Sequence, residues 1–243
     1  MKINIIGHWG GFPKVGEATS GYLIEHDGFK LLLECGSGVV SSLQKKTNIS
    51  DIDAVLISHY HYDHFCDIGP LQYARLIKTQ LGEINKTLPI YAPNNSMYFD
   101  ALSLENYTKG YKYDDSQILN IGPFNITFIK NIHPVESFSI KIQCENTIFS
   151  YTSDTSYFEE LNEFFKGSDI LLCECSFYAN MDGSNAGHLN STQAGMIAEK
   201  SNIKKLILTH LPHFGEKDRL ITEAKEFFKG EIILAEYLLE LNI

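Results

Sequence analysis

Long apolar runs are absent from this chain of 243 residues, and none approaches the ~20 residues that a membrane-spanning helix needs. Residues 1–7 are too short a segment, and too soon interrupted, to serve as a secretory signal. The motif CxxC is also absent among the five cysteines, so we expect free, mostly buried thiols in a reducing compartment. These absences predict a cytoplasmic protein that does not contact a membrane.

Positive charge is scarce, because 20 lysines and arginines stand against 30 aspartates and glutamates, which gives a formal net charge of -10. This balance argues against broad electrostatic capture of nucleic acid. No low-complexity linker and no fixed-period repeat interrupts the chain. A chain of this length buries about 70–75% of its unfolded surface without disulfide or metal staples. We therefore expect one domain over residues 1–243.

Potential metal ligands are densest in residues 59–64 (HYHYDH), which follow the apolar run 54–57. In an extended segment the first two histidines point to one side, and the chain must then turn to place Asp63 and His64. Three imidazoles and a carboxylate are costly to bury unless they are paired or bound to metal. The hexapeptide therefore predicts part of a metal cleft, and the alternative is a solvated polar turn.

Further polar residues stand where predicted strands end. They are His133 after residues 124–132, Asp154 after 147–151 and His210 after 206–209. Ligand-binding loops gather at the carboxyl ends of strands on α/β scaffolds. A lone histidine at such a position is more often an ordinary hydrogen-bonding residue. Because His188 and the hexapeptide add two more positions of this kind, the pattern favours one shared site.

Strand and helix patterns alternate along the chain. Strands are predicted at residues 2–6, 22–25, 30–34, 54–58, 89–91, 117–121, 124–132, 138–143, 147–151, 170–175, 206–209 and 232–235. Helices are predicted at 39–45, 67–80, 157–165, 191–201 (with Ser191 as the N-cap) and 216–228. Residues 107–113 are predicted to be a loop, either facing the substrate or merely solvated. The order predicts an α/β fold of two packed sheets with outer helices, a four-layer αββα sandwich.

With residues 59–64, His133, Asp154 and His210 in this order, the chain resembles the metallo-β-lactamase superfamily. The glycine-rich residues 7–13 and the segment 31–38 (LLLECGSG) also fit, so the resemblance extends from Lys2 to about Ala235. It implies the αββα metallo-β-lactamase fold and a hydrolase with two metal ions.

The resemblance also implies a ligand set. His59, His61 and His133 would hold one metal, Asp63, His64 and His210 the second, and Asp154 would bridge them. Nitrogen and oxygen donors without thiolate suit Zn²⁺, two per chain, with Mn²⁺ or Fe²⁺ as the other candidates. A hydroxide that bridges the metals would attack phosphorus in line.

Within the superfamily the chain looks most like the ribonuclease Z branch of phosphodiesterases, because residues 187–192 (GHLNST) precede a predicted helix and then His210. That branch carries an additional histidine, which His188 matches. We expect His188 to be the general acid, a role worth about 10²–10⁴-fold in rate, with Asp63 as the second catalytic residue. The alternative is that His188 merely caps the helix. Glu34 replaces the family's aspartate in the turn after the second strand, and it can orient a ligand histidine.

One departure from the branch concerns the substrate. Members that process transfer RNA carry a long, flexible arm between the third histidine and the bridging aspartate, whereas His133 and Asp154 are only 21 positions apart here. The missing arm favours smaller substrates. The expected partner is a phosphodiester, either a small nucleotide or RNA. The sequence implies no protein partner, although related enzymes are often homodimers.

Three residues are candidates for contact with the substrate. Trp9 and Phe12 are placed to flank a base, and His213 follows the ligand His210 closely. Core packing of the two aromatic rings and a surface position for His213 are the alternatives. Residues 7–11 lack the G-x-G-x-x-G spacing of a dinucleotide-binding turn.

Two other functions remain open from the sequence. A hydrolase of thioesters, lactones or lactams can use the same scaffold, since fold does not determine substrate. An iron oxygenase or a metal-dependent binding protein is the third hypothesis. A redox relative should carry extra sequence for a flavin domain, and a pure binder has no use for an acid at His188.

Overall fold

The structure, a computed structural model, describes residues 1–94 and 97–243. It divides into two compact units, each with its own seven-stranded sheet. The first unit comprises Met1–Asp114 and Glu236–Asn242, and the second comprises Asp115–Ala235 and Ile243. The single domain expected over residues 1–243 stays a prediction.

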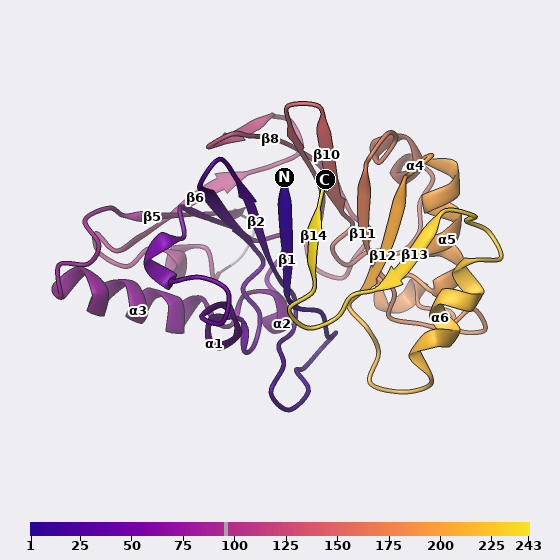
Figure 1. Cartoon of the computed structure of the whole chain (residues 1–243), viewed down its shortest axis with the longest axis horizontal. Coiled ribbons are helices and arrows are strands. Elements are labelled where there is room, and N and C mark those ends of the chain that lie inside the picture. The colour runs from indigo at the N-terminus through magenta and orange to yellow at the C-terminus, as the bar shows by residue number, and fades with distance from the viewer. Residues whose placement is uncertain (95–96) are drawn as a thin grey trace. The chain divides into compact units, whose positions relative to one another are not determined.

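The sheet of the first unit has the strand order β14-β1-β2-β3-β4-β5-β6 (Figure 1). Its strands are β1 (Lys2–Gly7), β2 (Gly21–His26), β3 (Phe29–Leu33), β4 (Ala54–Leu56), β5 (Leu88–Pro93), β6 (Thr108–Tyr113) and β14 (Glu240–Asn242). Its helices are α1 (Val39–Leu43), α2 (Tyr62–Phe65) and α3 (Ile68–Gln80), with 3₁₀ turns η1 (Ile49–Asp51) and η2 (Asp100–Leu102). From β3 to β6 the strands pair in parallel. The carboxyl ends of β3 and β4 therefore lie at one edge of this sheet.

Two sequence predictions in this unit are wrong. Residues 107–113, predicted to be a loop, contain β6, which pairs in parallel with β5. The sequence predicts 232–235 as the last strand, whereas β14 follows it and pairs antiparallel with β1. Both strands lie at sheet edges and depend on partners far away in sequence, so their local pattern carries little signal.

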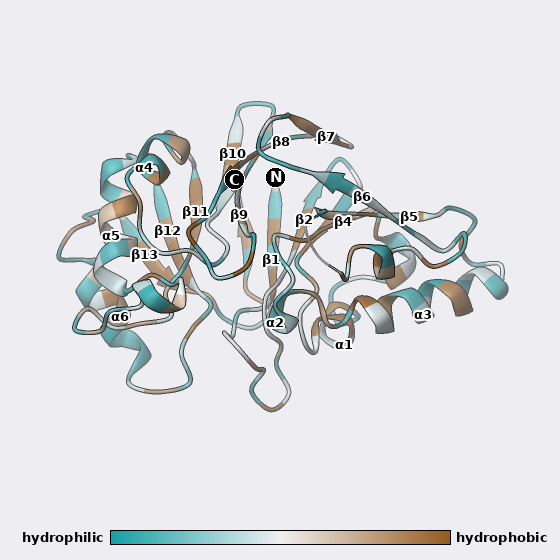
Figure 2. Cartoon of the chain, turned by 180° about the vertical axis from the view of Figure 1, so that it is seen from behind, coloured by the Kyte–Doolittle hydropathy of each residue, from teal (hydrophilic) through white to brown (hydrophobic). Residues whose placement is uncertain are grey.

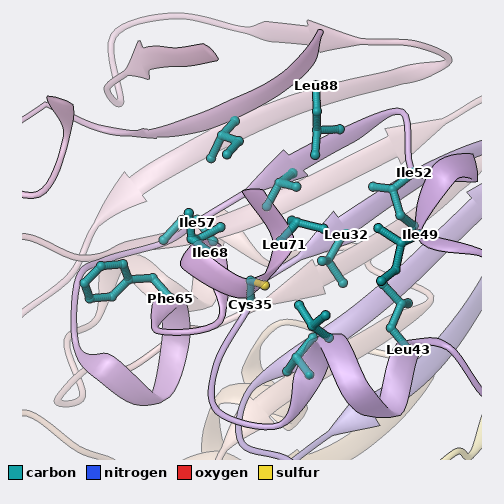
Figure 3. Packing of buried hydrophobic residues seen from close by; sticks show 14 of the residues in the cluster. Leu32, Cys35, Leu43, Ile49, Ile52, Ile57, Phe65, Ile68, Leu71 and Leu88 are labelled. Atoms are coloured by element: carbon teal, nitrogen blue, oxygen red, sulfur yellow. The ribbon is translucent and has the colours of Figure 1, made fainter. Parts of the chain in front are cut away.

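A hydrophobic cluster in the first unit fixes both ends of the ligand hexapeptide. In Figure 3, Ile68 and Leu71 of α3 lie near Ile57 and Leu32. These side chains are almost completely buried, and the burial of each is worth about 1.5–3 kcal/mol. Hydrophobic and hydrophilic segments alternate along α3 in Figure 2, as expected for a helix with one buried face. Ile57 lies just before the hexapeptide and Phe65 directly after it, and both belong to the cluster.

The sheet of the second unit has the strand order β13-β12-β11-β10-β9-β8-β7. Its strands are β7 (Leu119–Ile121), β8 (Phe124–Lys130), β9 (Phe138–Cys144), β10 (Thr147–Tyr151), β11 (Ile170–Glu174), β12 (Lys205–Thr209) and β13 (Glu231–Leu234). Its helices are α4 (Glu160–Phe164), α5 (Ser191–Lys200) and α6 (Lys217–Ala224), with the 3₁₀ turn η3 (Ser184–Ala186). Strands β10 to β13 are parallel, and β9 is antiparallel to both β8 and β10. The carboxyl ends of β8, β10, β11 and β12 therefore share one edge.

The sequence pattern identifies all strands of the second unit but overextends two of its helices. Helix α4 begins at Glu160, because Tyr157 lies outside it and its hydroxyl accepts hydrogen bonds from Asn162 and Lys200. Helix α6 ends at Ala224 rather than at residue 228, since the chain turns there and buries Phe228. The hydrophobic periodicity of the sequence reveals neither the position of Tyr157 outside α4 nor the burial of Phe228 after α6.

The structure also tests what the sequence predicts for the cysteines, for membrane-spanning helices and for the fold class. Four of the five cysteines are buried and Cys66 is half-buried. Over residues 1–94 and 97–243, we find no helix with both the length and the apolar character to cross a membrane. Two mixed sheets with helices agree with the predicted α/β class.

Candidate metal centre

The first unit brings the predicted ligands of the hexapeptide together after β4. The ring centroid of His59 lies 4.9 Å from that of His61 and 4.1 Å from that of His64. The chain then enters α2 at Tyr62, and this helical turn supplies the predicted corner. Nε2 of His64 lies 3.6 Å from Oδ2 of Asp63. His59, His61, Asp63 and His64 form the N-terminal ligand cluster.

Glu34 lies against the N-terminal ligand cluster. It directly follows β3 and is completely buried. Its Oε1 accepts a hydrogen bond from the backbone N–H of Ser58 (3.1 Å), and its Oε2 lies 3.8 Å from Nδ1 of His64. The hydroxyl of Ser58 lies 2.9 Å from Nδ1 of His59. Burial raises the pKa of Glu34, and the contacts with His64 and Ser58 offset only part of that rise.

The glycine-rich loop after β1 reaches the same cluster. The backbone N–H of Gly11 donates to Oδ2 of Asp63 at 2.7 Å. Phe12, the next residue, is 61% exposed, whereas Trp9 is 5% exposed and donates its indole N–H to Glu17. Contact of Trp9 and Phe12 with substrate stays a prediction, and only Phe12 has a ring that is open to solvent.

The second unit gathers its predicted residues at the edge where β8, β10, β11 and β12 end. Nε2 of His210 lies 3.3 Å from Oδ2 of Asp154. The ring centroid of His188 lies 5.4 Å from that of His133 and 5.3 Å from that of His210. His133, Asp154 and His210 form the C-terminal ligand cluster, and His188 adjoins it. His213 is half-buried, and its contact with substrate stays a prediction.

One hydrogen bond sets the proton position on His133. Nδ1 of His133 lies 2.9 Å from the carbonyl oxygen of Gly187. Because a carbonyl can only accept, Nδ1 carries the proton and Nε2 keeps its lone pair for a metal. Burial lowers the pKa of His133, which favours the neutral ring that a metal requires. Gly187 has a φ of +79°, and a Cβ there would lie 2.5 Å from Nδ1 of His133, so the position demands glycine.

Glu174 is a functional candidate that the sequence pattern did not reveal. It ends β11 and is completely buried. Its Oε1 accepts a hydrogen bond from Nδ1 of His188 at 3.0 Å and from the backbone N–H groups of Thr155 (3.2 Å) and Leu189 (3.1 Å). Thr155 directly follows Asp154. Glu174 therefore holds the predicted acid and the loop of one predicted ligand.

Ser176 connects the other oxygen of Glu174 to a predicted ligand. Its hydroxyl donates to Oε2 of Glu174 at 2.8 Å and lies 2.8 Å from Nδ1 of His210. A hydroxyl has one proton, so Ser176 accepts from Nδ1–H of His210. Nε2 of His210, which lies 3.3 Å from Oδ2 of Asp154, then keeps its lone pair for a metal. The sequence feature that could have revealed Glu174 is a glutamate at the end of an apolar strand, because a buried carboxylate requires hydrogen-bond partners.

Left-handed backbone recurs close to both clusters. Glu34 has a φ of 62°, Ser153 of 52° and His210 of 53°, and each lies within two residues of a strand's carboxyl end. Residues with a side chain rarely adopt this conformation, and it costs about 1–3 kcal/mol at each position. Such strain persists where the surrounding structure fixes a functional side chain.

Helix α5 is capped without His188. Its N-cap is Asn190, whose side chain accepts from the backbone N–H of Gln193, while the side chain of Gln193 accepts from the backbone N–H of Asn190. The prediction of Ser191 as the N-cap is wrong, because Ser191 is the first helical residue. The capping role considered for His188 is thus filled by another residue, and its ring is held by Glu174 instead.

The donor atoms within each unit fit a divalent metal. Two donors bound to one tetrahedral Zn²⁺ at about 2.0–2.2 Å lie roughly 3.3–3.6 Å apart. The pair His64 and Asp63 shows 3.6 Å, and the pair His210 and Asp154 shows 3.3 Å. Imidazole nitrogen and carboxylate oxygen are suitable ligands for Zn²⁺, Mn²⁺ and Fe²⁺.

Clustered histidines and carboxylates at the strand ends of two mixed sheets define a metal-binding α/β protein. The chain belongs to the β-lactamase superfamily, because the model of the Beta-lactamase superfamily domain matches residues 29–211. This family match and the structural likeness described next confirm both the predicted resemblance and the metallo-β-lactamase fold.

Similar proteins agree with this assignment. The "Probable metallo-hydrolase YhfI" of Bacillus subtilis is 46% identical over 237 residues, which cover 97% of each chain. The crystal structure of YhfI matches with a TM-score of 0.98 and covers 99% of this chain and 98% of that one. Ribonuclease Z of Clostridium tetani is 24% identical over 94% of each chain. Human tRNase Z, short form, shares the fold with a TM-score of 0.78 at 19% identity over 100% of this chain and 99% of that one. The class that these relatives support is a metallo-hydrolase of the β-lactamase fold.

Proposed function

We propose that this protein is a phosphodiesterase of the ribonuclease Z-like type with two metal ions and with His188 as the general acid. The observation that carries the proposal is the hydrogen bond of 3.0 Å between Nδ1 of His188 and the buried carboxylate of Glu174. An imidazole that donates Nδ1–H to a carboxylate carries its mobile proton at Nε2. An alkoxide that leaves phosphorus needs such a proton, so this pair favours phosphodiester chemistry.

The ligand assignment of the proposed metal centre is the one that the resemblance to the superfamily implies. We assign His59, His61 and His133 to one ion, Asp63, His64 and His210 to the second, and Asp154 to both. Zn²⁺ suits these donors best, with Mn²⁺ and Fe²⁺ as the other candidates. When bound, the two ions supply an activated water near neutral pH and neutralise charge on the phosphoryl oxygens.

The protein's own residues control the proton. The carboxylate of Glu174 orients the ring of His188 and stabilises its protonated form. Nε2 of His188 then gives its proton to the oxygen that leaves phosphorus. Through Ser176 the same carboxylate orients His210, which couples the acid to one ligand of the centre.

Two features favour small phosphodiesters over folded RNA. The segment between His133 and Asp154 holds β9 and β10, which leaves no length for an arm that grasps RNA. The formal net charge of -10 disfavours a large polyanion. The relative named ribonuclease Z, at 24% identity, supports phosphodiester chemistry without specifying the substrate of this chain.

A parallel hydrolysis screen tests the proposal. Protein loaded with Zn²⁺, Mn²⁺ or Fe²⁺ is assayed against bis-p-nitrophenyl phosphate, cyclic nucleotides, short oligoribonucleotides, a thioester and a lactone. We expect hydrolysis of the phosphodiesters to dominate. Hydrolysis of the cyclic nucleotides and oligoribonucleotides, whose leaving groups are alcohols, should depend on His188. Dominant hydrolysis of the thioester or lactone would replace the proposal with the acyl-hydrolase alternative, and oxygen consumption with bound iron would replace it with an oxygenase.

His26→Ala is the matched control for the histidine variants in this screen. His26 lies at the end of β2, before the turn that leads to β3, and it belongs to neither ligand cluster. Its substitution should leave both metal content and turnover at the wild-type level. A loss of activity in this control would show that the protein does not tolerate truncation of a histidine side chain to alanine. The role of His188 would then be judged from His188→Gln, which keeps a polar side chain of similar size.

A further inference from the structure

A hollow in the second unit adjoins the C-terminal ligand cluster. Its volume is about 430 Å³, and its lining residues are Ile132, His133, Pro134, Ser184, Asn185 and Gly187. Binding sites for small molecules typically measure about 300–1,000 Å³, so this hollow has room for one small organic group. Two chain segments form it, namely residues 132–134 after β8 and residues 184–187 around η3.

Hydrogen bonds join the two segments, so the hollow is preformed. Nδ1 of His133 donates to the carbonyl oxygen of Gly187 at 2.9 Å. Ser156 connects the segments a second time, because its hydroxyl donates to the carbonyl oxygen of Ser184 and its backbone N–H to that of Ile132, both at 2.9 Å. Preformed sites bind ligands at a lower cost in conformational entropy.

The lining has a mixed chemistry. Ile132, which is 53% exposed, and Pro134 present aliphatic surface. Asn185 and Ser184 are exposed and present an amide and a hydroxyl. The lining residues include neither lysine nor arginine, so the hollow is poorly suited to a second phosphate. A neutral group with flat apolar faces and a hydrogen-bonding edge fits this combination, and a nucleoside has that character.

We infer that this hollow binds a nucleoside on the leaving side of the phosphodiester, with Asn185 as the residue that recognises it. The inference rests on the proposed function. Gly187 lines the hollow, and His188, the next residue, is the proposed acid, with its ring centroid 5.4 Å from that of His133. On this inference, the oxygen that receives the proton belongs to the group in the hollow.

The proposed hydrolysis consumes one water molecule and transfers one proton to the leaving oxygen. The oxygen of water bonds to phosphorus, and the bond between phosphorus and the nucleoside oxygen breaks. His188 gives its proton to the nucleoside oxygen and regains one from the attacking water. The products are a phosphomonoester and a nucleoside with a free hydroxyl.

Kinetics with two substrates test the inference. In a dinucleoside monophosphate the leaving group is a nucleoside, whereas in bis-p-nitrophenyl phosphate it is not. Asn185→Ala should raise KM for the first substrate about 3- to 10-fold, which matches the loss of one hydrogen bond, with a smaller rise in KM for the second substrate. Asn185→Trp, which fills the hollow, should lower kcat/KM for the dinucleoside far more than kcat/KM for bis-p-nitrophenyl phosphate. Asn120→Trp is the control, since Asn120 lies on β7 and pairs with Asn125 near the distant start of β8.

Direct binding separates this inference from the proposed function. Adenosine and uridine, which carry no phosphate, are titrated into metal-loaded wild-type protein and Asn185→Trp by NMR. Binding to the wild type but not to Asn185→Trp supports the hollow as a nucleoside site, even where no phosphodiester is hydrolysed and the proposed function fails. Absence of binding, or equal dinucleoside kinetics in wild type and Asn185→Trp, overturns the inference while leaving the phosphodiesterase proposal intact.

Discussion

Nδ1 of His188 lies 3.0 Å from Oε1 of Glu174, a carboxylate that is completely buried at the end of β11. A buried carboxylate persists only when it is well supplied with donors, and Glu174 also receives the hydroxyl of Ser176. The first unit contains a comparable arrangement, in which buried Glu34 accepts from the backbone of Ser58, whose hydroxyl contacts a ligand histidine. Each cluster thus depends on one glutamate and one serine.

Replacing His188 should remove proton donation without removing metal. We expect His188→Ala to lower turnover of phosphodiesters with alcohol leaving groups about 10²–10⁴-fold. Bis-p-nitrophenyl phosphate should lose much less, because nitrophenolate leaves without a proton. Metal content, measured by elemental analysis, should stay at the wild-type value. Unchanged turnover on both kinds of substrate would eliminate the acid role.

Glu174→Gln should have an effect on the same step that is smaller than that of His188→Ala. The amide can still hold the ring of His188, but it lacks the charge that stabilises the protonated imidazole. We expect a loss of about 10–100-fold in kcat, the range seen when a partner of a functional histidine is replaced. Glu174→Asp keeps the negative charge but places it farther from His188, so this variant separates the effect of charge from the effect of distance. A full wild-type rate in Glu174→Gln would contradict the positioning role.

The proposed ligand residues can be selected from the sequence because their signal is local. Residues 59–64 concentrate ligands directly after an apolar run, and His133, Asp154 and His210 follow recognisable strands. Glu174 was not predictable in this way, because its role depends on contacts with His188 and Ser176, which arise only when separate loops meet at the sheet edge. Strand β14 was not predicted for a related reason. It has only three residues, and they form a strand because they pair with β1 at the opposite end of the chain.

Removal of Asp63 should lower the metal stoichiometry. Asp63 is proposed to bind the second ion, and its Oδ2 lies 3.6 Å from Nε2 of His64. We expect Asp63→Ala to retain about one metal ion per chain where the wild type retains two, as measured by elemental analysis after dialysis. His26→Ala should match the wild type. Two ions at full occupancy in Asp63→Ala would contradict the ligand assignment.

Gly187→Ala should displace His133, and Gly167→Ala supplies a matched control. Both glycines have left-handed φ angles, +79° and +78°, so alanine costs a similar backbone strain of about 1–2 kcal/mol at each position. A Cβ at Gly187 would meet Nδ1 of His133 at 2.5 Å, whereas a Cβ at Gly167 would meet nothing within 4 Å. We expect both variants to lose stability in urea denaturation, and only Gly187→Ala to lose metal affinity, about 10–100-fold. Equal metal affinity in the two variants would show that His133 is not a ligand.

His8 gives the fold a dependence on pH that is separate from the ligands. Burial lowers the pKa of His8 to about 4, with Lys14 adding to the effect and Glu17 opposing it. In the unfolded chain a histidine titrates near 6.5. The unfolded state therefore binds a proton between these values while the folded state does not, so the free energy of unfolding falls as the pH is lowered from about 6.5 to 4.

Metal-free protein is the form in which this dependence can be measured, because protonation of ligands then has no bound ion to release. A pKa of about 4 instead of 6.5 corresponds to a loss on the order of 3 kcal/mol across the interval. We expect His8→Gln to lose less stability than the wild type between pH 7 and pH 4.5 in urea denaturation. His26→Gln, which replaces a half-buried histidine at a hairpin turn, is the matched control. Identical slopes for wild type and His8→Gln would mean that His8 is protonated in the folded state as readily as in the unfolded chain.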